Sequence, residues 1–386
     1  MRVLIASTPV TTHFTPMVPL ALALRAAGHE VLVLGQPEIA DAANGAGLSA
    51  IPVGDRFHAL ELLRGGLPEG VRPIQAGTGD RVAELTSAAQ VWRNHASHLL
   101  HDYLDVAASW RPDLMVSERM EFTGPVIAAV RGIPVVRHRW GVDPWDGRPL
   151  KFAGAFLEPA CQRLGLPGYP EDTVLLDPCP PELQVPGAAP GLPIRPTSFN
   201  GAGELPDWAL EPGSARRVCV CLGRQTLALN GIGLLRAIVA AFDGLSDVEA
   251  VITAEPEHQR ELGDLPENVR FVDPTPLDLI LGSCAAVVHH GGANTNMAAT
   301  VFGLPQLVLP QIQDQFAAAE RVAATGAGLA VETAGRQDDP AVLRENLRAL
   351  LDDPRHVEAA AGLRLSTTKM PAPAEVVTDL EKLVLR

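Results

Sequence analysis

The stretch from Val287 to Gln315 constrains the fold of this chain more than any other part of it. It reads VVHHGGANTNMAATVFGLPQLVLPQIQDQ. An apolar strand runs into a turn with two adjacent glycines, a helical pattern follows, and a second apolar run ends at Pro310. Glycines let a backbone approach a bound group closely, and a helix start presents unpaired N–H groups at the positive end of its dipole. We therefore predict a strand, a turn suited to a diphosphate, and a helix.

The rest of the chain alternates between apolar strands and helical patterns in the same way. In the first half, strands are predicted at 3–6, 29–34, 113–117 and 134–137, and helices at 16–27, 80–110 and 122–131. In the second half, strands are predicted at 217–222, 248–253, 269–272, 285–288, 306–309 and 328–331, and helices at 233–242, 294–301, 315–324 and 340–351. Continuous apolar strands separated by helices indicate parallel sheets that are covered on both faces. We predict an α/β chain with two doubly wound, Rossmann-like domains.

Proline and glycine are dense between the two halves, as in the segment PCPPELQVPGAAPGLPIRP. This composition predicts an extended connection over 166–212. We place the first domain at 1–201, a linker at 202–214, the second domain at 215–370 and a final amphipathic helix at 371–386. A length of 386 residues suits two domains of ordinary size.

The charge and the apolar pattern limit the partners of this chain. The net charge is −14, which argues against nucleic acid and anionic membranes. No apolar run approaches the roughly 20 residues that span a bilayer, and the N-terminus lacks the plan of a signal peptide. The five cysteines form no C-x-x-C pair, which fits buried thiols in a reducing compartment. We expect a cytoplasmic protein without a membrane span, and the sequence leaves its oligomeric state open, a homodimer included.

The 287–315 stretch resembles the donor-sugar signature of nucleotide-diphosphate-sugar glycosyltransferases of the two-domain, metal-independent kind. The likeness is greatest to the bacterial branch that decorates natural products such as aromatic polyketides, macrolides and enediynes. It implies the GT-B fold, in which two domains face each other across a cleft and the final helix crosses back to the first domain. It also implies inverting transfer of a (deoxy)sugar from a dTDP- or UDP-sugar in the second domain to a small-molecule aglycone in the first, with no metal or other cofactor.

This resemblance assigns roles to residues of the second domain. His289 matches the histidine that contacts the diphosphate. The turn that holds the phosphates is matched by Gly291, Gly292, Ala293, Asn294 and Thr295. Asp314 and Gln315 match the acid–amide pair that hydrogen-bonds the hydroxyls of the donor sugar. Neighbouring strand residues point to opposite faces, which disfavours a metal site at the two histidines, and we expect His290 to pack in the core.

In the first domain, the segment HFTPMVPLA that begins at His13 matches the N-terminal pattern of the family. On local grounds a single loop histidine is more often a solvated residue. The family's histidine is the general base, a role that suits imidazole because its pKa lies near neutrality. Relatives place an acid behind it, usually Asp, after the strand equivalent to 113–117. Here that position is Glu118, and Glu121 is an alternative. Candidates for contact with the acceptor are His138, Arg139 and Trp140.

Two positions depart from the family pattern. Pro274 stands where relatives carry the Trp of a W-x-P element that seats the nucleotide base. The first strand of the second domain ends in Gly223 and Arg224, where relatives have Gly-Thr or Gly-Ser. We hypothesise that Arg224 pairs with the departing diphosphate, as a guanidinium can do bidentately, although an exposed arginine without a role fits the pattern about equally well. The choice between thymidine and uridine rests on kinship alone.

Several alternatives remain open at this point. The helix at 80–110 carries His95, His98 and His101 at a spacing of three, where a metal site is conceivable. A solvated face, or the lining of an acceptor pocket together with Trp92, fits this pattern better. The two departures are consistent with a non-catalytic homologue that helps another transferase. A sugar epimerase of the same shape is less consistent with the transferase motifs, and a nicotinamide dehydrogenase is disfavoured because no G-x-G-x-x-G follows a strand.

Overall fold

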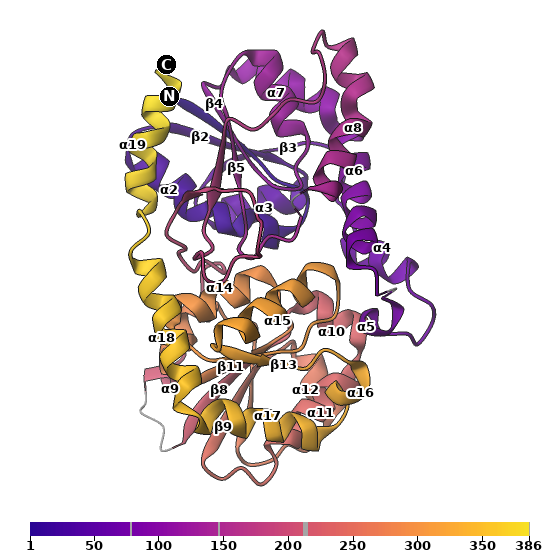
Figure 1. Cartoon of the computed structure of the whole chain (residues 1–386), viewed down its shortest axis with the longest axis vertical. Helices are drawn as coiled ribbons and strands as arrows, with labels where there is room; N and C mark the ends of the chain where they lie inside the picture. Colours follow the sequence, from indigo (N-terminus) through magenta and orange to yellow (C-terminus); the bar gives the residue numbers. More distant parts are fainter. Residues whose placement is uncertain (78, 146, 211–214, 386) are drawn as a thin grey trace.

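The computed structural model describes residues 1–77, 79–145, 147–210 and 215–385, and contains two parallel β-sheets (Figure 1). The first sheet has the strand order β3-β2-β1-β4-β5-β6-β7, and the second has the order β10-β9-β8-β11-β12-β13. In each sheet the second and third strands in sequence lie on one side of the first strand, and the later strands lie on its other side, as in doubly wound folds. The predicted pair of doubly wound α/β domains is confirmed.

The strands of the first sheet are β1 (Arg2–Ala6), β2 (Glu30–Gly35), β3 (Ser49–Pro52), β4 (Leu114–Glu118), β5 (Val135–His138), β6 (Val174–Asp177) and β7 (Leu192–Pro193). Those of the second are β8 (Arg216–Cys221), β9 (Val248–Thr253), β10 (Val269–Val272), β11 (Ala286–His289), β12 (Gln306–Val308) and β13 (Gly328–Ala330). All the pairings are parallel, so the carboxyl ends of the strands in each sheet lie at one edge.

The helices before β8 are α1 (Thr11–Phe14), η1 (Thr15–Met17), α2 (Val18–Ala26), α3 (Pro37–Gly45), α4 (Ala59–Gly65), α5 (Pro73–Ala76), α6 (Arg81–Trp110), α7 (Thr123–Arg131), α8 (Arg148–Arg163) and α9 (Asp207–Leu210). Those after it are α10 (Arg224–Asn230), α11 (Ile232–Phe242), α12 (Pro256–Leu262), α13 (Leu277–Ile280), η2 (Leu281–Ser283), α14 (Ala293–Phe302), α15 (Gln313–Thr325), α16 (Ala334–Gln337), α17 (Pro340–Asp352), α18 (Pro354–Thr368) and α19 (Pro373–Val384).

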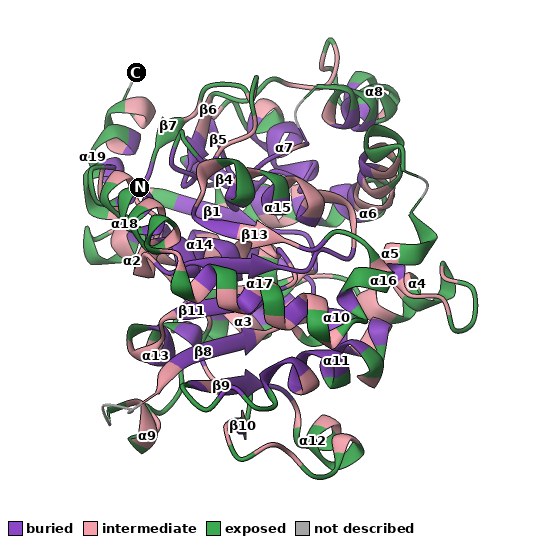
Figure 2. Cartoon of the chain, turned by 60° about the horizontal axis from the view of Figure 1, so that its bottom comes forward, coloured by how far each residue is buried: buried purple, intermediate pink, exposed green. Residues whose placement is uncertain are grey.

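The central strands of both sheets are buried, while the helices turn exposed faces outward (Figure 2). Val3 and Ile5 of β1, and Val218 and Val220 of β8, are fully buried. Such strands read as continuous apolar runs because helices cover both faces of the sheet. Among the described residues, no single helix has the length and apolar character to cross a bilayer, although the sharply bent pair α10 and α11 passes the same test jointly.

The proline-rich segment between the halves is more ordered than predicted. Within 166–212, which we predicted to be an extended connection, β6 and β7 add two strands to the first sheet. Prolines are tolerated there because β7 is a two-residue edge strand, and Ile194 continues it by donating its N–H to the carbonyl of Asp177. The predicted linker at 202–214 contains α9, and its residues 211–214 lie outside the described residues.

The last helix of the chain lies against the first sheet, away from the sheet that precedes it in sequence. Figure 1 shows α18 beside the lower sheet and α19 beside the upper one. Val376, Val377 and Leu380 of α19 join the core cluster formed by β1 and α2. Where α18 leads into α19, the carbonyl of Pro371 accepts a 2.7 Å hydrogen bond from the N–H of Arg195.

Candidate active site

His13 and Glu118 lie together at the carboxyl edge of the first sheet. The parallel pairing of β1 with β4 sets Ala6 opposite Ser117, so the loops that follow these two strands are neighbours. Nδ1 of His13 lies 2.7 Å from the hydroxyl of Thr8 and 3.8 Å from Oε1 of Glu118. The histidine and the carboxylate are therefore adjacent, as the sequence predicted, but the closest partner of the ring is Thr8.

Glu118 is a fully buried carboxylate. Its oxygens accept hydrogen bonds from the N–H groups of Thr8 (3.1 Å) and Met120 (2.6 Å). Burial alone would raise the pKa of Glu118, but the contacts with His13 and these two N–H groups outweigh it, and the pKa lies below its usual value. Glu118 thus places a fixed negative charge beside His13, and such a charge stabilises an imidazolium.

Glu121, the alternative support for His13, is engaged elsewhere. Its Oε1 accepts hydrogen bonds from the N–H (2.8 Å) and the hydroxyl (2.6 Å) of Thr123. Oε2 is buried without a hydrogen-bond partner among the described residues. Burial raises the pKa of Glu121 to about 7. Of the two carboxylates, the structure therefore joins Glu118 to the histidine.

Two tryptophans hold the ring of His13. The indole of Trp140 stacks on the imidazole with ring centroids 3.9 Å apart and an interplanar angle of 27°. The ring of Trp92 meets the imidazole edge-on at 5.7 Å. Nδ1 is occupied by Thr8, and Nε2 has no hydrogen-bond partner among the described residues. The ring is thus fixed in orientation with one nitrogen free.

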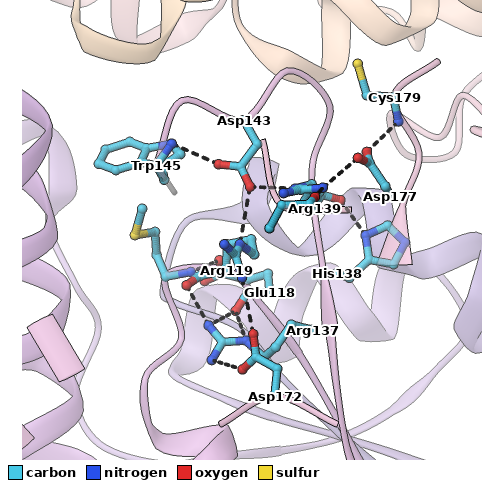
Figure 3. Close-up of polar contacts among 12 residues, drawn as sticks. Glu118, Arg119, Arg137, His138, Arg139, Asp143, Trp145, Asp172, Asp177 and Cys179 are labelled. Carbon is cyan, nitrogen blue, oxygen red and sulfur yellow. Dashed lines mark hydrogen bonds and ion pairs between the residues drawn. The ribbon is translucent and has the colours of Figure 1, made fainter. Parts of the chain in front are cut away.

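A network of buried arginines and aspartates lies around the carboxyl end of β5, directly before Trp140 in the sequence (Figure 3). Arg139 is fully buried and donates to Asp143 and Asp177, each at 2.7 Å. Arg119 also donates to Asp143, at 3.2 Å. Arg137 donates to the carbonyl of Glu118 at 2.8 Å. These contacts tie the loop that carries Trp140 to β4, β5 and β6.

The acceptor contacts predicted for His138 and Arg139 are contradicted by their burial. His138 is 1% exposed, and its Nδ1 lies on the carbonyl of Arg139. Burial lowers the pKa of His138 to about 4. Arg139 belongs to the ion-pair network described above. His138 ends β5, an inner strand of the sheet, and Arg139 is held by its buried ion pairs, so only Trp140 of this group lies beside the candidate base.

On the second sheet, β11 leads through Gly291 and Gly292 into α14. Gly292 precedes the helix and no side chain caps it, so the N–H groups of Ala293, Asn294 and Thr295 form an open helix start. Gly291 has φ +90°, and a Cβ there would lie 2.9 Å from the carbonyl oxygen of Gln315. The Asn294 amide donates to the hydroxyl of Thr15, so this turn contacts the first domain.

The diphosphate contact predicted for His289 stays a prediction, and the position of the side chain in this structure does not support it. His289 is fully buried, with Nε2 2.8 Å from Oε1 of Gln306 and Nδ1 accepting the N–H of Gly291 at 3.0 Å. Burial lowers the pKa of His289 to about 3. Both ring nitrogens serve the protein interior, so His289 shapes the turn from inside.

His290 is half-buried directly after β11, so it is less deeply packed than the core position that we predicted for it. Its ring lies beside Gly223 and Gly292. A Cβ on Gly223 would lie 3.0 Å from the imidazole, and a Cβ on Gly292 would lie 2.3 Å from it. Burial lowers the pKa of His290 to about 4, so the ring is neutral at pH 7. Strand alternation predicts that one of two adjacent histidines faces the cleft, but it does not say which one.

Asp314 and Gln315 begin α15 at the same side of the cleft. Oε1 of Gln315 accepts hydrogen bonds from the N–H groups of Gln311 (2.9 Å) and Ile312 (3.2 Å). The side-chain carbonyl therefore caps the helix, and the side-chain NH₂ group is left to donate to a ligand. Burial raises the pKa of Asp314 to about 6, and the charge of His13 opposes that shift. Asp314 therefore lies within electrostatic reach of the candidate base in the other domain.

Arg224 follows Gly223, which has φ +73° and precedes α10. The Arg224 side chain is 80% exposed, and its Nε lies 3.1 Å from Oε1 of Glu255. The pairing of Arg224 with a diphosphate stays a hypothesis, because the guanidinium would have to leave Glu255 or contact Glu255 and the diphosphate together. Pro274, at the family's base-seating position, is exposed.

The part of the chain that the structure describes contains no cluster of side chains that could bind a metal ion. No group of three or more His, Cys, Asp or Glu side chains is placed there to hold an ion. His98 and His101 are exposed on α6, while His95 is half-buried. The three histidines therefore do not converge on one point.

Comparison with known proteins gives full-length relatives. The model of the Erythromycin biosynthesis protein CIII-like N-terminal domain matches residues 22–223, and that of the C-terminal domain matches 237–383. L-demethylnoviosyl transferase of Streptomyces niveus is 37% identical over 98% of this chain and 97% of its own. 10-deoxymethynolide desosaminyltransferase of Streptomyces venezuelae is 33% identical over 99% of this chain and 97% of its own.

Solved structures show the same likeness. Spinosyn rhamnosyltransferase SpnG complexed with thymidine diphosphate superposes with a TM-score of 0.88 at 39% identity, over 99% of this chain and 100% of its own. Glycosyltransferase VinC in complex with dTDP superposes with a TM-score of 0.83 at 32% identity, over the whole of both chains.

Proposed function

Because the chain belongs to the EryCIII-like family of antibiotic glycosyltransferases, with the GT-B fold, we propose that it moves a deoxysugar from a thymidine-diphosphate sugar to a hydroxyl of a polyketide-type aglycone. The observation that carries this proposal is the meeting of two half-sites. His13 with Glu118 stands on one side, and the open start of α14 with Asp314 stands on the other. Family membership leaves the helper, epimerase and dehydrogenase alternatives without support.

His13 is the general base in this proposal. In the tautomer that this role requires, Nδ1–H donates to the Thr8 hydroxyl 2.7 Å away, and the lone pair of Nε2 takes the acceptor's proton. The imidazolium that forms is stabilised by Glu118, whose carboxylate lies 3.8 Å from Nδ1. Stacking on Trp140 holds the ring at the orientation that this transfer requires.

The second domain stabilises the leaving group. The N–H groups at the start of α14 point toward an anion and cost no reorganisation as negative charge develops on the diphosphate. His290 is neutral and can donate one hydrogen bond beside Gly223 and Gly292. This arrangement supports a reaction in which dipoles and hydrogen bonds, without a metal ion, offset the charge of the departing TDP.

The opposed placement of base and leaving-group site supports inversion at the anomeric carbon. A nucleophile activated at His13 approaches from the first domain, while TDP departs toward the second, as in a single in-line displacement. Asp314, which lies within electrostatic reach of His13, is suited to accept hydrogen bonds from the sugar hydroxyls. NMR of the product from a donor of known anomeric configuration checks this, and retention of configuration would contradict it.

A calorimetric titration with TDP and UDP, side by side and with EDTA present, tests the proposed donor site. We expect TDP to bind without metal, and His290→Ala to weaken it about tenfold, the equivalent of about 1.4 kcal/mol. His258→Ala, on α12, is the matched control and should bind as the wild type does. If neither nucleotide binds, the proposed donor site is wrong.

The net charge of −14 supports small-molecule substrates over nucleic acid, and the five free cysteines support a cytoplasmic role. Cell fractionation with an antibody against the chain tests the location, and recovery in the membrane or secreted fraction would contradict it.

A further inference from the structure

The segment of the first domain that contains α4 and α5 reaches across to the second domain (Figure 1). Arg64 of α4 donates a 2.9 Å hydrogen bond to the carbonyl of Ala228 in α10. Arg72 directly precedes α5, and its side chain is 12% exposed. A guanidinium that is buried to this extent at a contact between domains needs partners on the facing side.

Three side chains of the second domain hold the guanidinium of Arg72. Nε donates to Oδ1 of Asn230 at 2.8 Å, and Nη2 donates to Oε1 of Gln337 at 3.1 Å. Nη1 pairs with the carboxylate of Asp338. Asn230 is 9% exposed and Gln337 is fully buried, so solvent has little access to these two contacts. The planar fork of Arg72 therefore fixes the ends of α10 and α16 relative to the first domain.

Gln337 connects Arg72 to the loop that precedes α15. Its Oε1 also accepts a 2.7 Å hydrogen bond from the side-chain amide of Gln311, and its NH₂ group donates to the carbonyl of Pro310 at 3.1 Å. The backbone N–H of Gln311 donates to Oε1 of Gln315 at 2.9 Å. A chain of hydrogen bonds therefore runs from the first domain to the amide that we assign to the donor sugar.

The same loop contains a strained residue. Gln313 has φ +36°, a left-handed conformation that residues with a side chain rarely adopt. It begins α15 directly before Asp314. Such a conformation persists only where the surrounding contacts hold it, and the hydrogen bonds of Gln337 to this loop are contacts of that kind. Loosening them lets the loop relax and moves Asp314 and Gln315 together.

The contacts of Arg72 lie on the side of the molecule away from the segments that join the two domains. Those segments follow β7 and α18, and they lie against each other. The N–H of Arg195 donates to the carbonyl of Pro371 (2.7 Å), and its Nε donates to that of Met370 (3.0 Å). Figure 1 shows α18 and α19 on the opposite side from α4 and α5. A rotation of the domains about the joined segments would therefore open a wide gap at Arg72.

We propose that Arg72 is a positioning residue of the first domain that completes the donor-sugar site of the second. With the domains closed, Arg72 holds Gln337, and Gln337 holds the loop that sets Asp314 and Gln315 for the sugar hydroxyls. With the domains apart, the loop is released and the sugar is held less tightly, while the diphosphate site at α14 is unaffected. This inference rests on the proposed function and adds to it a coupling between closure of the cleft and recognition of the sugar.

Hydrogen exchange, with and without saturating TDP, tests the positioning directly. In Arg72→Ala we expect the N–H groups of Gln311 and Ile312 to exchange about tenfold faster, because their acceptor Gln315 is no longer held in place. Arg64→Ala is the matched control and should exchange as the wild type does. It removes an exposed hydrogen bond from the same segment, but that bond goes to α10. Peptides from β8 should exchange alike in all three proteins, which shows that the fold is retained.

Calorimetric affinities for TDP and TDP-glucose test the coupling to the sugar. The ratio of the two Kd values should change about three- to tenfold in Arg72→Ala and in Gln315→Ala, in the same direction. The double variant should show no further change, because both substitutions act on the same contact. Arg72→Lys keeps the charge beside Asp338 but lacks the planar fork, so it should restore only part of the wild-type ratio. Arg72→Ala should bind TDP alone within twofold of the wild type.

The outcomes separate this inference from the function on which it rests. Unchanged exchange at 311–312 in Arg72→Ala, or an equal increase in Arg64→Ala, would overturn the inference. So would a Kd ratio that changes in Gln315→Ala and stays constant in Arg72→Ala. A ratio that is constant in Gln315→Ala would instead overturn the sugar contact that the proposed function gives to this residue. Failure of TDP to bind would overturn the donor site itself, and the exchange measured without nucleotide is read separately from it.

Discussion

The two halves of the active site differ in the charge of the polar side chains that are buried around them. On the acceptor side, charged side chains are buried in quantity: Glu118 and Arg139 are fully buried and Asp143 is 3% exposed. On the donor side, the interior behind the turn is neutral. Oε1 of Gln306 lies 2.8 Å from His289 and 3.0 Å from the amide of Asn296, and Gln337 accepts from Gln311.

The difference follows from what each half has to do. The donor half meets a diphosphate that already carries negative charge, and backbone N–H groups at a helix start supply the attraction without a buried cation. The acceptor half meets a neutral hydroxyl and must create charge on His13, so it needs a fixed carboxylate and counter-ions to hold it. Changes in the acceptor half should therefore act through charge, and changes in the donor half through backbone geometry.

The largest effect is expected from His13→Ala. Removing the general base should lower kcat by about 10²–10⁴-fold, because no other group at Nε2 can take the proton. TDP affinity should remain within twofold of the wild type, since the nucleotide binds the other half. Steady-state kinetics and calorimetry check both. An equal loss of TDP affinity would show that the halves are not separable.

Asp143→Ala should produce the next largest change, and in stability. It leaves two arginines, Arg119 and Arg139, short of a buried counter-ion, and breaking such a pair costs about 3–5 kcal/mol. Urea unfolding measures it. Thr300→Val is the comparison in the neutral interior and should cost about 1–3 kcal/mol, because it leaves one buried group, the Gln306 amide, without its acceptor. Equal costs would remove the distinction between the two halves.

Glu121→Gln should stabilise the protein only at high pH. The pKa of Glu121 is about 7 in the fold against 4.5 when unperturbed, so the folded state holds a proton that the unfolded chain releases. Stability from this group is present below pH 4.5 and is lost as the pH rises to 7. We expect Glu121→Gln to match the wild type at pH 4.5 and to exceed it at pH 8, by on the order of 3 kcal/mol. A gain that is equal at both values would contradict this.

Gly291→Ala tests the donor half by geometry alone. Its φ of +90° and the Gln315 carbonyl 2.9 Å from a new Cβ both oppose the substitution. We expect a loss of about 1–3 kcal/mol in stability together with weaker TDP binding. Gly233→Ala, in an exposed turn of α11 with nothing within 4 Å, is the control and should be neutral or slightly stabilising. Unchanged TDP affinity in Gly291→Ala would place the nucleotide elsewhere.

Thr8→Val should give the smallest effect. It removes the hydroxyl at 2.7 Å from His13 while keeping the side-chain shape. We expect kcat to fall about three- to tenfold, with TDP affinity unchanged and the pH profile of kcat shifted, because the ring loses its nearest partner. Thr8→Ser should restore most of the rate. If Thr8→Val and the wild type share one pH profile, Thr8 only fills space.

Sequence reasoning located every strand of the second sheet and missed three strands of the first. The strands β8 to β13 were predicted within a residue or two because apolar residues dominate the sequence around each of them. The strands β6 and β7 were missed, since their neighbouring prolines and short lengths give no periodic signal, and β3 was missed because its four residues carry partly buried and exposed positions.

In the site, adjacency was predictable and orientation was not. His13 and Glu118 were paired correctly in space because parallel strands bring their carboxyl ends to one edge. The orientations of His289 and His290 could not be predicted, since they depend on which strand face the turn leaves. The stacking of Trp140 on His13 arises from tertiary packing between distant elements, and no local pattern predicts it.

The placement of α19 has a consequence for the order of events during synthesis. The helix closest to the C-terminus covers α2, near the start of the chain, and His29 reaches Glu381 at 2.9 Å. During translation the first domain is synthesised early, yet it stays uncovered along α2 until the whole second domain and α19 have followed. Its apolar surface there is consequently exposed to chaperones and proteases until α19 packs on it. Premature termination a few codons before α19 would leave the donor sheet intact and the acceptor half incomplete.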